Sequence, residues 1–327
     1  MGDPAIVTLD DIKQARNRLR GIAVHTPLVT FPDPGGDREL YLKPENLQPI
    51  GAFKLRGAYN KIASLPDDER GRGVIAYSSG NHGQGVAYAA RALGVKAVIV
   101  MPGSAPAIKR EATAAMGAEL VLVGPSSEER RIKAEELAAE KGYVVVPPYN
   151  DERIIAGQGT IGLEILEDLP EVETVIVPVG GGGMISGVAT AIKLSRPQVN
   201  VIGAEPVLAA DAQASLRAGK IIEITAEDTT RTMADGLRTQ SLGPINFEHI
   251  RRYVDDIVTV SEEEILKAMR RLARNPKTVA EPSGAVSVAA FLFHHEELPR
   301  TRVNVAIISG GNIEPQTLRE IGVDSRV

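Results

Sequence analysis

The sequence predicts an α/β protein with two lobes, each built on an open, mostly parallel β-sheet flanked by helices. The chain has 327 residues, which is longer than most single domains. From Gly73 onward, short apolar segments alternate with amphipathic helical segments, the pattern of βαβ units. Pro147-Pro148 interrupts the alternation, which then resumes. We therefore expect a small domain of residues 71–150 and a large domain of residues 1–70 and 151–327.

The first 70 residues contain two expected helices and a strand. Thr8-Leu-Asp-Asp11 has the pattern of a capping box, and apolar residues continue at helical spacing until Gly21. Residues 40–43 are expected to form a short strand, and residues 55–65 a helix.

The rest of the chain is expected to alternate between strands and helices. In the small domain the pattern predicts strands at residues 74–77, 97–100, 120–123 and 143–146, with helices at 85–93, 107–116 and 128–141. In the large domain it predicts strands at 174–179, 199–204 and 303–308, with helices at 154–166, from the glycine run to about 194, from 261 to about 275, and from 284 to 293. Residues 207–242 follow no regular pattern.

The composition excludes several classes of function. The chain carries 37 basic and 42 acidic residues, a formal charge of −5, which offers no electrostatic basis for binding nucleic acid. It has no cysteine, so disulfides, thiolate nucleophiles and cysteine-ligated metals are excluded. The N-terminal residues lack the features of a signal peptide, and no apolar run is long enough to span a membrane. We expect a cytoplasmic protein.

Lys54 is the first candidate for covalent chemistry. It lies in a run of turn formers and small residues instead of on a charged helix face. Packing against Ala52 and Phe53 would remove water from the amine and help it lose a proton, as Schiff-base formation requires. Most lysines are solvated surface charges, so this lysine alone is weak support for catalysis.

A glycine run, Gly180-Gly-Gly-Gly183, follows an apolar strand and opens a helix, where bare amides can bind a phosphate. The same segment nearly satisfies a dinucleotide fingerprint that ends at Ser186, with Glu205 where a ribose-binding acid would stand. By itself it leaves a nicotinamide cofactor and another phosphorylated ligand open.

Two further loops follow predicted strands. Ser78-Ser79-Gly80-Asn81-His82 offers amides and hydroxyls at the carboxyl edge of a sheet, where a substrate carboxylate would fit, although such a segment is also a common helix cap. Ser309-Gly-Gly-Asn312 follows a buried strand and is equally consistent with a tight turn.

Taken together, these segments resemble the fold-type II pyridoxal-phosphate enzymes, in particular the serine/threonine dehydratase and serine racemase family. Between about Asp10 and Asn312 the family's motifs occur in the family's order: Lys43-Pro-Glu-Asn-Leu-Gln48, Gly51-Ala-Phe-Lys-Leu-Arg-Gly-Ala58, Ser78-Ser-Gly-Asn-His-Gly-Gln84, Gly180-Gly-Gly-Gly-Met184 and Ser309-Gly-Gly-Asn312. The resemblance implies a fold like that of the tryptophan synthase β-subunit. It also accounts for Lys54, which a hydride-transfer enzyme would leave idle.

The resemblance implies a role for each segment. Lys54 would hold pyridoxal 5'-phosphate covalently and then act as the base that removes the substrate's Cα proton. The predicted cofactor contacts are Phe53, Lys54, Asn81 at the ring hydroxyl, Gly180, Gly181, Gly182 and Gly183 at the phosphate, Met184, Gly236, Glu281, and Ser309 at the pyridine nitrogen. The predicted substrate contacts are Ser78, Ser79, Gly80, Asn81 and His82.

The implied activity is the conversion of a 3-hydroxy amino acid to a 2-oxo acid and ammonia, and the sequence does not distinguish serine, threonine and 3-hydroxyaspartate. Ser79 resembles the racemase-type base on the cofactor face opposite the lysine, so Lys54 and Ser79 are the predicted catalytic pair for racemisation. A protein that is mainly a racemase, a β-replacement synthase of the same fold and a non-catalytic cofactor carrier remain alternatives.

The resemblance also implies a metal and a partner. Glu205, the carbonyl of Ala209 and Asp211 match the family's divalent-cation site, and ligation by oxygen suits Mg²⁺, Ca²⁺ or Mn²⁺. The alternative is a pair of solvated acids. The family is commonly dimeric, so a homodimer acting on a small amino acid is expected, without a nucleic-acid or membrane partner.

Overall fold

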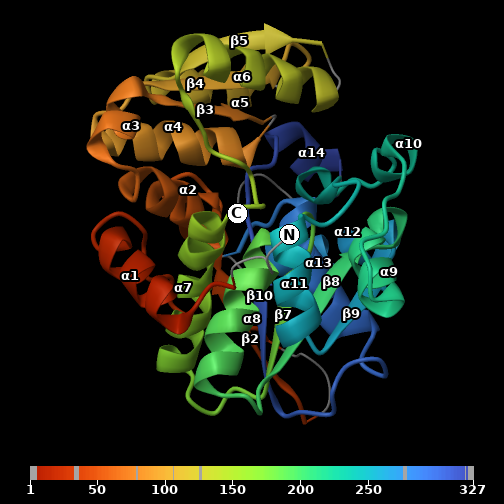
Figure 1. Ribbon diagram of the computed structural model, residues 1–327. Coiled ribbons are helices and arrows are strands. Elements are labelled where there is room, and N and C mark those ends of the chain that lie inside the picture. Colours follow the sequence, from red (N-terminus) through yellow and green to blue (C-terminus); the bar gives the residue numbers. More distant parts are fainter. Residues whose placement is uncertain are drawn as a thin grey trace.

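The computed structural model describes residues 6–32, 37–78, 80–105, 107–124, 127–274, 278–320 and 322. Two lobes are visible, each with its own sheet between helices, and the predicted α/β architecture is confirmed (Figure 1). The lobe at the top of Figure 1 carries β3 to β6, and the lower lobe carries the larger sheet.

The larger sheet has six strands in the order β1-β2-β10-β7-β8-β9. Their bounds are β1 (Val29–Thr30), β2 (Glu39–Pro44), β7 (Thr174–Pro178), β8 (Asn200–Pro206), β9 (Asp256–Val260) and β10 (Val303–Ile308). All neighbours are parallel except β1 and β2, which are antiparallel. The smaller sheet is wholly parallel in the order β5-β4-β3-β6, with β3 (Val74–Tyr77), β4 (Ala97–Pro102), β5 (Glu119–Val123) and β6 (Val144–Val145).

The helices are α1 (Leu9–Leu19), α2 (Lys54–Ala63), α3 (Asp67–Arg72), α4 (Asn81–Leu93), α5 (Ala107–Ala115), α6 (Ser127–Lys141), α7 (Glu152–Asp168), α8 (Gly183–Ser195), α9 (Asp211–Ala218), α10 (Ala226–Thr229), α11 (Pro244–Tyr253), α12 (Glu262–Ala273), α13 (Pro282–Phe293) and α14 (Pro315–Glu320). Short 3₁₀ turns are η1 (Glu45–Leu47), η2 (Val207–Ala209) and η3 (Asp235–Leu237).

Both faces of the larger sheet are covered, which explains why its central strands carry apolar side chains on both faces. On one face Ile176 and Val258 pack with side chains from α12 and α13. On the other face Val175 and Val177 pack with α7, α8 and α11. In the smaller sheet the same alternation places Ile99 with α2 and α4, and the neighbouring strand residues with α6.

The carboxyl ends of the parallel strands lead into the predicted site segments. β2 leads through η1 toward Lys54, β3 toward Ser78, β7 toward Gly180 and β10 toward Ser309. The backbone N–H of Phe53 donates to the Ser309 carbonyl at 3.1 Å, so the segment before α2 is tied to the loop after β10. Ligand sites of open α/β sheets lie at this edge.

The structure differs from the predicted elements in several places, and β1, α3 and α14 were also not predicted. Residues 207–242 were expected to be irregular, but α9 and α10 form there. The sequence pattern did not predict α11 or β9, which completes the larger sheet. The helix expected to end near Asn275-Pro276 is α12, which ends at Ala273, and residues 275 and 276 lie outside the described residues.

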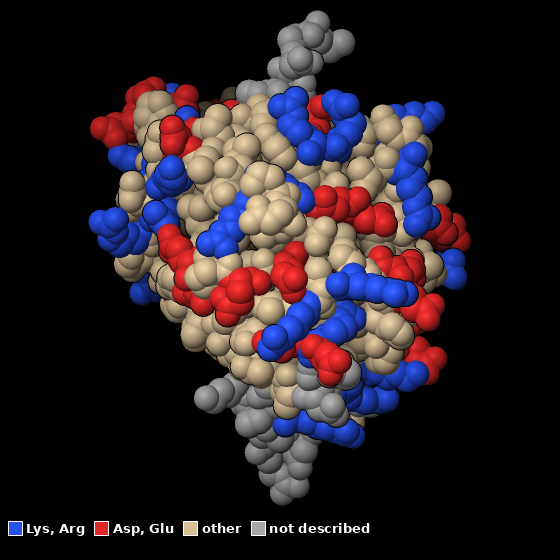
Figure 2. Space-filling view, turned by 90° about the horizontal axis from the view of Figure 1, so that it is seen from below, with Lys and Arg blue, Asp and Glu red and all other residues tan. Residues whose placement is uncertain are grey.

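Figure 2 shows how charged side chains are distributed over one face of the molecule. Acidic and basic side chains are interspersed over the face drawn in Figure 2, so that face carries no extended area of one charge. In the described part of the chain, no helix combines the length and apolarity needed to cross a bilayer.

Candidate active site

Lys54 is the first residue of α2, and Phe53 occupies the N-cap position. Its Nζ donates to the backbone carbonyl of Pro148 at 2.7 Å and lies 5.2 Å from the centre of the Phe53 ring. Burial lowers the pKa of the Lys54 amine to about 8. The predicted desolvation of this amine is therefore present, and a substantial share of it is neutral near pH 8.

A cavity of about 560 Å³ brings most of the predicted site together. Apart from Ser79, which lies outside the described residues, the predicted cofactor and substrate residues all line it: Phe53, Lys54, Ser78, Gly80, Asn81, His82, Gly180, Gly181, Gly182, Gly183, Met184, Gly236, Glu281 and Ser309. These residues come from both lobes, so a ligand in the cavity would contact both lobes.

The glycine run forms the turn between β7 and α8. Gly182 has a φ of 91°, which favours glycine, and a Cβ on Gly181 would clash with the ring of Tyr149. The run therefore needs residues without side chains. Because α8 begins at Gly183, its unpaired amides lie at the cavity wall, where an anionic group is favoured.

Asn81 opens α4 and reaches across to α13. Its Nδ2 donates to Oε1 of Glu281 at 2.7 Å. Burial, together with the nearby Asp235 carboxylate, raises the pKa of Glu281 to about 8. Glu281 is therefore largely protonated at neutral pH, and the contact adds little negative charge to the cavity.

Ser309 follows β10 and is almost fully buried. Its hydroxyl donates to the backbone carbonyl of Ser283 at 3.4 Å, a long contact that leaves its oxygen able to accept. A hydroxyl, unlike a carboxylate, imposes no charge on a ring nitrogen placed against it.

His82 is buried at the start of α4, and its Nε2 lies 2.9 Å from the carbonyl of Val146. A carbonyl only accepts, so this nitrogen carries the proton. Burial and the Lys54 charge lower the pKa of His82 to about 3. The ring is therefore neutral and oriented by the backbone, and it has little capacity to act as a base.

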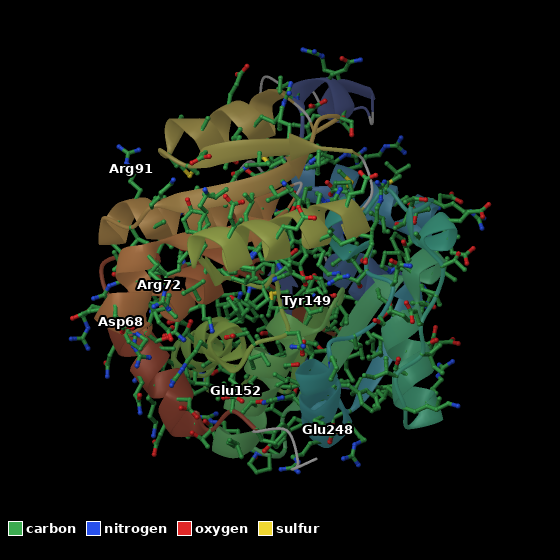
Figure 3. All side chains as sticks on the ribbon, turned by 45° about the horizontal axis from the view of Figure 1, so that its top comes forward. Asp68, Arg72, Arg91, Tyr149, Glu152 and Glu248 are labelled. Carbon is green, nitrogen blue, oxygen red and sulfur yellow. The ribbon has the colours of Figure 1, made fainter. Side chains whose placement is uncertain are left out.

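Sequence reasoning missed several residues that line the same cavity, among them Tyr149 and Lys109. Tyr149 lies near the middle of the molecule, and burial raises its pKa to about 12, so its phenol stays protonated (Figure 3). Lys109 of α5 pairs with Asp235 of η3 at 3.0 Å, an ion pair between the two lobes. Tyr149 could have been found because it follows the end of a predicted parallel strand. Lys109 carries no such signal, since it resembles a solvated helix residue.

The predicted cation residues lie apart from this cavity, where β8 passes into α9. Glu205 and Asp211 are both buried, and Glu205 accepts hydrogen bonds from the backbone N–H groups of Ala212 and Gln213. Both carboxylate oxygens of Asp211 are buried without a hydrogen-bond partner. Burial raises the pKa of Asp211 to about 7. Within the described residues, no group of three or more His, Cys, Asp or Glu side chains is arranged to hold a metal.

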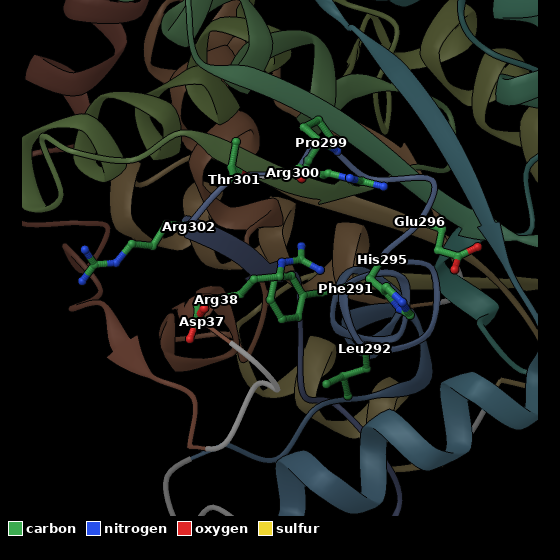
Figure 4. Close-up of a pocket in the computed structure, with 10 residues that line it drawn as sticks. All are labelled: Asp37, Arg38, Phe291, Leu292, His295, Glu296, Pro299, Arg300, Thr301 and Arg302. Carbon is green, nitrogen blue, oxygen red and sulfur yellow. Dashed lines mark hydrogen bonds between the residues drawn. The ribbon is translucent and has the colours of Figure 1, made fainter.

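A second hollow, of about 770 Å³, contains none of the predicted site residues. It lies beside the C-terminal end of α13, and the guanidinium of Arg38 stacks 4.0 Å from the centre of the Phe291 ring (Figure 4).

Comparison with known proteins finds relatives of the same family as the sequence motifs indicate. The family described as "Pyridoxal-phosphate dependent enzyme" matches residues 20–310. An L-threonine ammonia-lyase of Thermotoga maritima is 47% identical over 97% of this chain and 78% of the relative. An L-threo-3-hydroxyaspartate ammonia-lyase of Saccharomyces cerevisiae is 43% identical over 94% of each chain. The solved structure of maize serine racemase superposes with a TM-score of 0.92 at 38% identity, covering 97% of both chains.

Proposed function

The chain belongs to the fold-type II pyridoxal-phosphate-dependent enzymes, in the serine/threonine dehydratase and serine racemase family, and we propose that Lys54 is the residue through which it acts as an ammonia-lyase on a 3-hydroxy amino acid. One observation carries the proposal: an amine of lowered pKa shares a cavity with a bare glycine turn at a helix N-terminus. The printed names of two relatives, which act on threonine and on 3-hydroxyaspartate, support this substrate class.

The residues present fit pyridoxal phosphate. The glycine run, where a Cβ on Gly181 would clash with Tyr149, would hold the phosphate, and Ser309 would meet the pyridine nitrogen. Met184, Gly236 and Phe53 would complete the contacts. When bound, this cofactor withdraws electrons from the substrate's Cα and so makes its proton acidic.

The protein's own groups would then bind the substrate and move the proton. The amides at the start of α4, from Ser78 through His82, would hold the substrate carboxylate. The neutral amine of Lys54 would accept the Cα proton. Loss of that proton and of the β-hydroxyl releases water, and the aminoacrylate-type product hydrolyses to a 2-oxo acid and ammonia.

The test is a substrate panel with purified protein. We expect a yellow protein that releases 2-oxo acid and ammonia from at least one of L-serine, L-threonine and the two 3-hydroxyaspartate diastereomers. Lys54→Ala should lose the yellow colour, and its rate of 2-oxo acid release should fall by about a thousandfold or more. Lys61→Ala is the matched control, because Lys61 lies on the same helix but pairs with Asp151 at 2.7 Å. Colour without turnover on any substrate would instead favour the cofactor carrier, and turnover only with an added nucleophile the β-replacement synthase.

Racemisation is a second candidate function, favoured by the likeness to maize serine racemase. We propose that Ser79 supplies the second base, opposite Lys54. Ser79→Ala should then abolish the interconversion of the L and D enantiomers, while elimination of water continues. An equal loss of both activities would contradict a separate role for Ser79.

The proposal extends to a cation and to assembly. A divalent cation, Mg²⁺, Ca²⁺ or Mn²⁺, would be held by Glu205, the Ala209 carbonyl and Asp211, and the two orphaned oxygens of Asp211 support it. Assembly as a homodimer and a cytoplasmic location stay predictions.

A further inference from the structure

The side-chain amide of Asn81 is held at both ends. Its Nδ2 donates to Glu281 Oε1 at 2.7 Å, and its Oδ1 accepts from Nδ2 of Asn312 at 2.8 Å. An asparagine amide has nearly the same shape either way round, so its orientation is decided by what its partners can donate and accept. The partners of Asn312 therefore matter as much as those of Asn81.

A backbone carbonyl decides the orientation of this chain of amides. Nδ2 of Asn312 also lies 2.8 Å from the carbonyl oxygen of Ile50. A carbonyl oxygen only accepts, so the Asn312 atom that faces it must be the nitrogen. The same nitrogen faces Asn81, whose nearer atom must then be its oxygen. The nitrogen of Asn81 is thus turned toward Glu281.

The surroundings leave Asn312 little freedom to move. A Cβ on Gly51 would clash with the amide of Asn312, and a Cβ on Gly310 would clash with Glu281. The backbone N–H of Asn312 also donates to the Glu281 carboxyl group. Asn312 therefore contacts both the Asn81 amide and its other partner, Glu281.

We propose that Asn312 is a positioning residue that holds Asn81 with an amide N–H, and not its carbonyl oxygen, presented to the cofactor cavity. An amide nitrogen carries two hydrogens, and Glu281 takes one. The second is left to donate to the ring oxygen of pyridoxal phosphate, which the family resemblance places against Asn81 in the cavity of the proposed function. When the ring hydroxyl is ionised its oxygen can only accept, so in the reversed amide two oxygen acceptors would face and repel each other. The inference rests on the proposed function but concerns a residue outside the cavity lining.

The experiment measures how well the apoprotein distinguishes pyridoxal phosphate from its 3-deoxy analogue, which lacks the ring hydroxyl. Dissociation constants for both come from equilibrium dialysis. We expect the wild type to prefer pyridoxal phosphate by about tenfold, the worth of one charge-assisted hydrogen bond. Asn312→Ala and the isosteric Asn312→Asp should bring that ratio close to one, as Asn81→Leu should.

Asn46→Ala is the matched control. Asn46 donates to the backbone carbonyl of Val279 at 3.0 Å and lies beside Gly311, the residue before Asn312. It should keep the wild-type ratio, even if its melting temperature falls. Asn312 variants that fold, as judged by circular dichroism, and keep the wild-type ratio would overturn the inference, as would a wild type that binds both compounds equally. A wild type that binds neither would overturn the proposed function itself.

Discussion

At the scale of single residues, the pKa of Lys54 can be tested directly. Burial lowers that pKa to about 8, so below pH 8 the amine is mostly protonated and unreactive, and above it mostly neutral. The rate at which the apoprotein captures pyridoxal phosphate should rise about tenfold per pH unit up to pH 8 and then level off. Stopped-flow absorbance measures this rate, with Lys54→Ala as the blank. A rate that still climbs above pH 10, as for an ordinary lysine, would contradict the shift.

The residues that the sequence could predict are those whose role belongs to a local motif. Lys54, Gly180 and Ser309 each follow a strand in a short, specific pattern, so chain order is enough to place them. The pairing of Lys109 with Asp235 joins residues 126 positions apart and leaves no local pattern. Asn312 belongs to the sequence motif Ser309-Gly-Gly-Asn312, but the orientation of its amide depends on the Ile50 carbonyl, which comes near only in the folded chain.

At the scale of elements, a buried charge cluster joins β2, η1, α2 and α7. The guanidinium of Arg56 contacts Glu45 at 2.8 Å and Glu164 at 2.6 Å, and Lys43 contacts Glu164 at 2.7 Å. Two cations face two carboxylates, so the cluster is neutral, and all four side chains are buried. Because Arg56 is two residues after Lys54, the cluster fixes the start of α2, which carries the Lys54 amine.

Replacing Arg56 by methionine should lower the free energy of unfolding by about 3 kcal/mol, because it leaves the buried Glu45 without a cation and Glu164 with Lys43 alone. The difference should shrink as pH falls, because Arg56 holds the pKa of the buried Glu164 carboxyl below its usual value, and this stabilisation is lost when Glu164 is protonated. Urea unfolding followed by circular dichroism at two pH values measures it. Lys267→Met is the control, because its pair with Glu263 is exposed and should be worth less than about 1 kcal/mol. Equal effects of the two changes would contradict the assigned weight of the cluster.

The turn from β8 to α9 allows a prediction about stability: whether Asp211→Asn is more or less stable than the wild type should depend on the presence of a divalent cation. Without a cation, Asp211→Asn should raise the melting temperature, because it removes repulsion from the buried Glu205 carboxylate. With Mg²⁺, Ca²⁺ or Mn²⁺ at a hundred times the dissociation constant, the wild type should gain about 2.7 kcal/mol and the variant almost nothing. Thermal unfolding with EDTA and with each ion tests both halves. A wild type indifferent to all three ions would contradict the site.

The prediction of strands succeeded where burial on both faces of the sheet requires apolar residues. It failed where a short segment becomes a strand only because a neighbouring strand is available to pair with it. The run Asp256-Ile-Val-Thr-Val260 is only five residues long, and it becomes β9 because β8 offers a free parallel edge. The division into residues 71–150 and residues 1–70 with 151–327 stays a prediction. It is supported by the strands of the smaller sheet, which all fall between residues 74 and 145.

At the scale of the whole molecule, the two lobes meet around the cavity, and the ion pair between Lys109 and Asp235 crosses between them at its wall. The side chain of Lys109 is 12% exposed and that of Asp235 is 45% exposed, so the pair is partly shielded from water. Partial burial strengthens such a contact relative to a free surface pair. The pair should therefore favour arrangements of the lobes that enclose the cofactor.

Breaking this pair should speed the loss of pyridoxal phosphate from the loaded protein. We expect Lys109→Met and Asp235→Asn each to raise the dissociation rate several-fold, and the double variant to add little, because either change alone removes the contact. The effect should fall in 1 M NaCl, since salt screens a partly exposed pair. Trapping released cofactor with an apoenzyme in excess measures the rate, and Lys267→Met again serves as the control. Additive effects in the double variant would mean that the two residues act separately, and that the ion pair does not hold the lobes together.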